Sequence, residues 1–75
     1  ADDLKGAEEE ARAATATDPT NPDNWLLLCT VLYQQGRLKE AFDEGKYGLN
    51  RSPGDRRSVN GSLAQFLRRV ELELH

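Results

Sequence analysis

The stretch NWLLLCTVLYQQG, residues 24–36, decides the fold of this chain. It contains the single tryptophan and many of the long aliphatic side chains, and it ends at a glycine. At 3.6 residues per turn, its apolar side chains fall on nearly every side of one helix. The bulkiest face consists of Trp25, Leu28, Cys29 and Leu32. A helix of this kind is covered by other helices or keeps one side for a partner.

Size and composition limit the class of protein. A chain of 75 residues makes one small domain, which buries only about 60% of its unfolded surface. The single cysteine excludes an internal disulfide, and no Cys/His cluster supplies metal ligands, so we expect no metal and no cofactor. No apolar run is long enough to span a bilayer, and no leader resembles a signal peptide. Because the chain begins with Ala rather than Met, we expect a fragment of a longer protein.

The net charge of −3 is unevenly distributed along the chain. Residues 1–25 carry seven acids against two bases, whereas residues 51–75 carry five arginines against three acids. The overall sign argues against nucleic acid as a partner, because phosphate binding needs a basic stripe. Either both ends present solvated faces, or they attract each other or neighbouring copies.

The first predicted helix covers residues 1–17. Asp2 and Asp3 suit its N-terminus, both as caps and as charges that complement the helix dipole. The glutamates at residues 8–10 are expected on its solvent side, where Glu8 can pair with Arg12 one turn further on.

Turn signals delimit two more helices. Asn21 is a predicted N-cap with Pro22 as the first helical residue, and this helix runs to about residue 35, before Gly36. The last predicted helix begins at Arg56 and carries an apolar stripe to the end of the chain.

Between them, residues 38–50 are predicted to form a helix that contains Gly45 and Gly48. Each glycine costs about 1 kcal/mol relative to Ala in a helix interior. We expect that the two glycines are present because they allow the backbone of this helix to come close to the following helix. A hinge at these positions is the alternative explanation.

The chain repeats itself after 34 residues. Both helix–turn–helix boundaries coincide under this shift, and a fixed period with two helices per unit is typical of a helical solenoid. The identical pairs are Leu4/Leu38, Lys5/Lys39, Ala7/Ala41, Glu10/Glu44 and Pro19/Pro53.

These residues resemble the tetratricopeptide repeat (TPR) family. The matching positions are Trp25, Leu28, Cys29, Gly36, Leu38, Ala41 and Pro53. The resemblance implies an all-α fold of about four helices, arranged as antiparallel hairpins in a short right-handed superhelix. It divides the chain into the second helix of a preceding repeat (1–21), a full repeat (22–55) and a capping helix (56–75). Gly45 and Gly48 depart from the family, which has larger side chains there.

No constellation of residues indicates catalysis. Cys29 lies on the packed face with no His or Lys nearby in sequence to activate it, and His75 is the last residue. Adjacent glutamates at residues 8–10 point in different directions on a helix, so they form no carboxylate pair. We therefore predict that the chain is not an enzyme.

The resemblance implies a groove that binds a protein or peptide. The residues that match its groove positions are Asp23, Leu26, Thr30, Tyr33 and Gln34 on the second helix and Arg57, Asn60, Ala64 and Arg68 on the last. Members that clamp a peptide carboxylate have Lys, Asn and Arg there, so the clamp is absent. An apolar centre with Arg57 and Arg68 at its rim favours an apolar segment with acidic flanks. Alternatively, neighbouring helices cover Leu26 and Tyr33.

The predicted function is a non-catalytic scaffold or adaptor module for protein–protein interaction. The first alternative is a structural module that forms homo-oligomers through an uncovered face of its first helix, formed by Leu4, Ala7 and Ala11. A weaker alternative is RNA contact by the C-terminal arginines.

Overall fold

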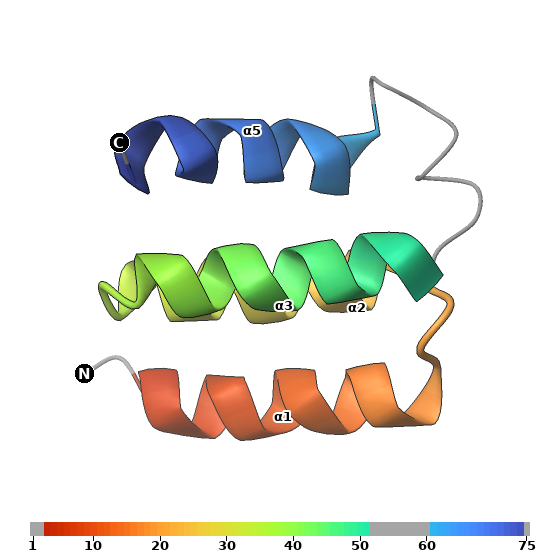
Figure 1. Ribbon diagram of the computed structural model, residues 1–75. Coiled ribbons are helices and arrows are strands. Elements are labelled where there is room, and N and C mark those ends of the chain that lie inside the picture. Colours follow the sequence, from red (N-terminus) through yellow and green to blue (C-terminus); the bar gives the residue numbers. More distant parts are fainter. Residues whose placement is uncertain (1–2, 52–60, 75) are drawn as a thin grey trace.

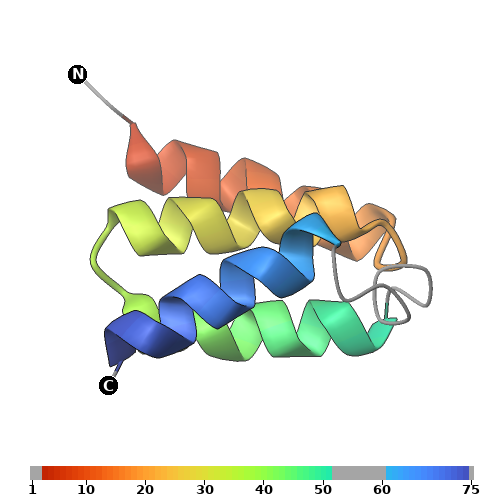
Figure 2. The same ribbon diagram turned by 90° about the horizontal axis from the view of Figure 1, so that it is seen from above.

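The computed structural model describes residues 3–51 and 61–74, and these residues form four α-helices without a strand. The helices are α1 (Leu4–Thr17), α2 (Pro22–Gln34), α3 (Leu38–Arg51) and α5 (Ser62–Leu74). Helices α2 and α3 form an antiparallel hairpin, and α1 and α5 lie on opposite sides of it (Figure 1). Seen from above, α5 lies over the line between α2 and α3, and it contacts both (Figure 2). This arrangement confirms the predicted all-α, TPR-like fold of stacked helices.

Local sequence signals set the helix ends. The Asp3 carboxylate accepts a hydrogen bond from the Gly6 N–H at 2.9 Å, and the Asn21 side chain accepts one from Asp23 N–H at 2.9 Å. Both contacts satisfy backbone donors that an N-terminal turn leaves free. After α2, Gly36 has a φ of +80°, a conformation that costs glycine little. The predicted caps at Asp3, Asn21 and Gly36 are therefore confirmed, and Asp2 lies outside the described residues.

The core lies where α1, α3 and α5 pack around α2. Trp25 is only 5% exposed, and its indole N–H donates a hydrogen bond to the Pro19 carbonyl at 2.8 Å. The bulky face of α2 is buried as predicted, because its side chains belong to one apolar cluster with residues of the other three helices. The buried cluster consists of Ala11, Trp25, Leu28, Cys29, Leu32, Ala41, Leu63 and Leu67.

The two glycines of α3 make room for side chains of two different helices. A Cβ atom on Gly45 would lie 2.3 Å from Leu67 Cδ2 of α5, so the following helix does occupy this space. A Cβ atom on Gly48 would lie 2.2 Å from Trp25 Cγ of α2. The expectation of contact with the following helix is therefore wrong for Gly48, because the indole of the preceding helix fills that position. In both cases the close neighbour is a side chain rather than backbone.

The last helix starts later than predicted. Helix α5 begins at Ser62, and Gly61 before it is not helical, so a continuous helix from Arg56 is wrong at this point. A glycine in a helix interior costs about 1 kcal/mol, which favours a break there. Residues 56–60 lie outside the described part of the chain. No helix among the described residues is long and apolar enough to cross a membrane.

Candidate functional site

A groove runs between α2 and α5. It encloses about 420 Å³ and is lined by Leu26 and Thr30 of α2 and by Ser62, Gln65, Phe66 and Arg69 of α5. Leu26 and Phe66 are half-buried and pack against the core, so they give the groove an apolar floor. The Thr30 hydroxyl donates a hydrogen bond to the Leu26 carbonyl at 2.8 Å, which satisfies it within its own helix. The groove therefore combines apolar surface with one cationic side chain.

Tyr33 lies further along α2, where α5 partly covers it. Its ring packs edge-on against Phe66, with 5.7 Å between the ring centroids and an angle of 68°. Its hydroxyl donates a hydrogen bond to Glu73 Oε2 at 2.5 Å. The hydrogen bond to this carboxylate, together with partial burial, raises the pKa of Tyr33. The phenol is therefore a neutral hydrogen-bond donor that is engaged within the fold.

The sequence-predicted groove residues on α2 occupy different surroundings. Leu26 and Thr30 line the groove, and Tyr33 contacts Phe66 of α5. Asp23 is exposed in the first turn of α2. Gln34 is exposed at the last turn, where it lines a separate hollow against α1. Of the predicted residues on α2, Leu26, Thr30 and Tyr33 therefore lie next to α5, whereas Asp23 and Gln34 have other surroundings.

On α5, the groove wall differs from the one that the repeat period predicts. Arg57 and Asn60 lie outside the described residues, and Ala64 is half-buried. Arg68 is exposed on α5 beside the groove lining, to which Arg69 contributes the cation. Sequence reasoning did not select the lining residues Ser62, Gln65, Phe66 and Arg69. Gly61 is the sequence signal for the later start of α5, because a glycine is unfavourable in a helix interior.

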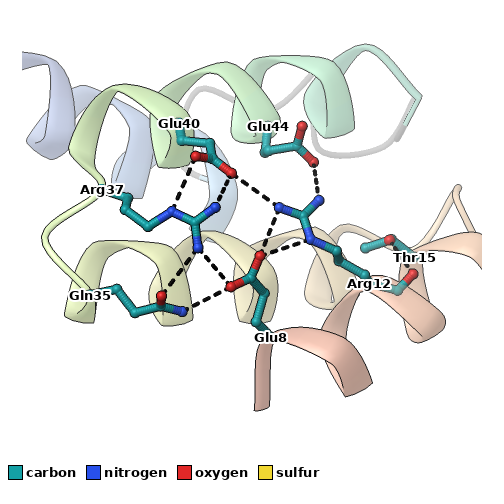
Figure 3. A network of polar contacts seen from close by, with 7 residues as sticks. All are labelled: Glu8, Arg12, Thr15, Gln35, Arg37, Glu40 and Glu44. Atoms are coloured by element: carbon teal, nitrogen blue, oxygen red, sulfur yellow. Dashed lines mark hydrogen bonds and ion pairs between the residues drawn. The ribbon is translucent and has the colours of Figure 1, made fainter. Parts of the chain in front are cut away.

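A polar network joins α1 to the turn between α2 and α3 and to α3 itself (Figure 3). At its centre, Glu8 accepts hydrogen bonds from Arg12 Nε at 3.0 Å, Gln35 Nε2 at 3.1 Å and Arg37 Nη1 at 2.7 Å. Arg12 and Arg37 both also reach Glu40 of α3. The network therefore ties three segments together.

The environment of Glu8 corrects one expectation and confirms another. Its pairing with Arg12 is confirmed, with 3.0 Å between Arg12 Nη2 and Glu8 Oε2. The expectation that it faces solvent is wrong, because its side chain is only 15% exposed under Arg37 and Gln35. Hydrogen bonds from Gln35, Arg12 and Arg37 lower the pKa of Glu8 to about 2. This carboxylate is therefore ionised and fixed as part of the scaffold.

Cys29 has the environment of a structural side chain. It is fully buried, and burial raises the pKa of its thiol to about 12. A thiol needs to ionise in order to act as a nucleophile or metal ligand. Within the described residues there is no group of three or more His, Cys, Asp or Glu side chains that could hold a metal ion. His75 lies outside those residues.

The face of α1 predicted to be uncovered is open only in part. Ala11 is fully buried in the core, so its expected exposure is wrong, because α2 packs directly over it. Leu4 and Ala7 are half-buried and border a hollow of about 450 Å³ with Asp3 and Gln34. On α2, the side chain of Leu27 is 49% exposed.

The described helices thus define an all-α protein with stacked antiparallel helices and a groove between two of them. The sequence profile of the tetratricopeptide repeat family matches residues 1–44, which cover α1, α2 and the first half of α3. The chain belongs to the tetratricopeptide repeat family. Repeats of this family are typically non-catalytic modules for protein–protein interaction. Comparisons with curated proteins and with solved structures gave no match.

Proposed function

We propose that this chain is a scaffold or adaptor module that holds a peptide or protein segment in the groove between α2 and α5. Membership in a family of interaction modules supports this proposal. The observation that carries it is the groove itself, because it is a hollow that combines apolar side chains, which pack against the core, with polar and cationic side chains. We further propose the division into a half repeat (1–21), a full repeat (22–55) and a C-terminal cap (56–75).

The groove favours one kind of segment. Leu26 and Phe66 offer apolar contact, and Arg69 adds a positive charge at the lining. Arg68 lies next to it in the sequence and is exposed on the same helix. An apolar segment with acidic flanks complements this combination, because the apolar side chains supply affinity and the charges supply orientation.

Selection from a library of random ten-residue peptides displayed on phage tests this proposal. The immobilised chain should enrich peptides that bind with measurable affinity, and Thr30→Arg should abolish that binding by filling the groove. Thr17→Arg is the matched control, because the Thr17 hydroxyl also donates to the carbonyl four residues earlier, on exposed α1 surface. Circular dichroism verifies that both variants fold. Equal binding by the two variants, or no enrichment at all, contradicts the proposal.

A second candidate function is self-association. Leu4 and Ala7 are half-buried beside Gln34 of α2, and the exposed Leu27 lies two helical turns before Gln34, on the same face of α2. Sedimentation velocity over a hundredfold range of concentration tests it. If self-association is the function, the chain forms oligomers that Leu27→Asp dissociates and Thr30→Arg leaves intact. A monomer at the highest concentration contradicts it.

A further inference from the structure

The contact between Tyr33 and Glu73 joins α2 to α5 next to the groove, because Tyr33 also packs against the lining residue Phe66. Glu73 lies one helical turn beyond Arg69 on α5, so the two side chains lie on the same face of the helix. The groove-lining positions Ser62, Phe66 and Arg69 continue along this face to Glu73 at steps of three or four residues. Glu73 therefore lies one position beyond the lining residues, on the face of α5 that borders the groove.

The groups around this carboxylate are those that recognise an acid. Tyr33 donates its hydroxyl proton to Glu73 Oε2 at 2.5 Å. Arg69 lines the groove together with Phe66, whose ring packs against that of Tyr33, and its positive charge lowers the pKa of the Tyr33 hydroxyl. Among residues 3–51 and 61–74, Arg69 forms no ion pair, although Glu73 is at the favourable spacing of four residues. Tyr33 thus supplies a neutral donor and Arg69 a cation beside the groove, and the carboxylate that accepts from Tyr33 comes from the chain itself.

We propose that Glu73 is an internal stand-in for an acidic side chain of the partner, which displaces it on binding. This inference rests on the proposed groove function and adds the chemistry of one partner residue. The partner is a peptide segment whose Asp or Glu accepts the Tyr33 hydrogen bond next to Arg69, with an apolar neighbour over Leu26 and Phe66.

Competition between the two carboxylates follows from the chemistry of the phenol. A tyrosine hydroxyl has one proton to donate, so Glu73 and a ligand carboxylate cannot both accept it. Two carboxylates at this position would also repel each other. The side chain of Glu73 is exposed, so it can turn into water at little cost when a ligand arrives. The internal contact therefore lowers the affinity for acidic segments without blocking the groove.

The test uses the peptides that the phage selection enriches, each paired with an analogue in which Asp or Glu is replaced by Asn or Gln. Fluorescence anisotropy gives their affinities for the unchanged chain and for Glu73→Ala. Glu71→Ala is the matched control, because it removes the same charge from an exposed site two residues away on the same helix. We expect Glu73→Ala to bind the acidic peptide about three- to fivefold more tightly, as for the loss of one exposed charge interaction. The amide analogue should bind Glu73→Ala no more tightly than it binds the unchanged chain. Glu71→Ala should bind the acidic peptide with the same affinity as the unchanged chain.

A Tyr33→Phe variant completes the experiment. It should bind the acidic peptide more weakly than the unchanged chain, and in this background Glu73→Ala should lose most of its effect. The inference would be overturned, while the groove function stands, if Glu73→Ala and Glu71→Ala increased the affinity for the acidic peptide equally. An equal increase in affinity for the acidic peptide and its amide analogue would also overturn it. If the library yields peptides without acidic residues, the inference is also overturned. If it yields no peptide, the proposed function and this inference both fail.

Discussion

Alanine at Gly48 should destabilise the fold, whereas alanine at Gly45 should leave it nearly unchanged. Both substitutions add one methyl group to the interior of α3, and both should gain about 1 kcal/mol of helix propensity. They differ in the atoms that the new methyl group meets. At Gly48 these are Trp25 Cγ, Cδ2 and Cβ at 2.2, 2.5 and 2.6 Å, and at Gly45 the nearest atom is Leu67 Cδ2 at 2.3 Å.

The magnitude follows from how far each neighbour can move. Trp25 Cβ can move only with the backbone of α2, and Cγ and Cδ2 can move only if the whole indole rotates, which its hydrogen bond to Pro19 and its burial oppose. Overpacking of this kind costs about 3 kcal/mol, the upper part of its usual range, which leaves a net loss of about 2 kcal/mol. Leu67 Cδ2 is a terminal methyl group that can rotate away, so its cost of about 1 kcal/mol cancels the propensity gain.

Urea unfolding followed by circular dichroism at 222 nm measures this difference. A loss of about 2 kcal/mol lowers the midpoint by about 1–2 M, given the slopes of small domains. The two variants control for each other, because they share the helix, the substitution and the added volume. A Gly48→Ala midpoint equal to or above that of Gly45→Ala would refute the reasoning.

Three further predictions follow from buried or paired groups. Trp25→Ala should lower the free energy of unfolding by about 3–5 kcal/mol, because it leaves a cavity in place of a side chain that is only 5% exposed and removes the hydrogen bond to the Pro19 carbonyl. Loss of the helical circular dichroism signal at 222 nm measures this destabilisation. Cys29 should resist an aromatic disulfide reagent at pH 8 in the folded chain and react in urea, because its pKa is raised to about 12; fast reaction of the folded chain would contradict its burial. The pKa of Glu8 falls from 4.5 to about 2 on folding, so its stabilisation is complete above pH 4.5 and is lost as the pH falls towards 2. Urea midpoints of the unchanged chain and Glu8→Gln should therefore differ most above pH 4.5 and converge near pH 2, and a constant difference would exclude this cause.

Helices α1, α2 and α3 and their capped ends were predictable because their signals are local, whereas the start of α5 was not predicted correctly. Asn21, Pro22 and Gly36 act on backbone groups within a few residues of themselves, so no distant part of the chain changes their effect. The bulky face around Trp25 was predictable because a side chain of that size is buried in almost any compact arrangement. Trp25 and Gly36 are also among the residues that carry the family resemblance, and the family match confirms it.

The errors arose where residues far apart in sequence meet. Glu8 looked like a solvated helix position, but Arg37 reaches it from 29 residues away and covers it. Gly48 was expected to accommodate the next helix, but the indole of Trp25 comes from the previous one. Helical periodicity describes one helix at a time, so it does not identify the neighbour of each face.

The sequence alone determined that this chain forms stacked helices of the tetratricopeptide kind, because burial of apolar stripes and capping of helix ends depend on neighbouring residues. Only the tertiary structure decided which face of α5 forms the groove and that Tyr33 meets Glu73, 40 residues away. The physical reason is that these contacts join side chains from distant parts of the chain, as Leu67 of α5 does against Gly45 of α3, and the spacing of residues along one helix does not specify them.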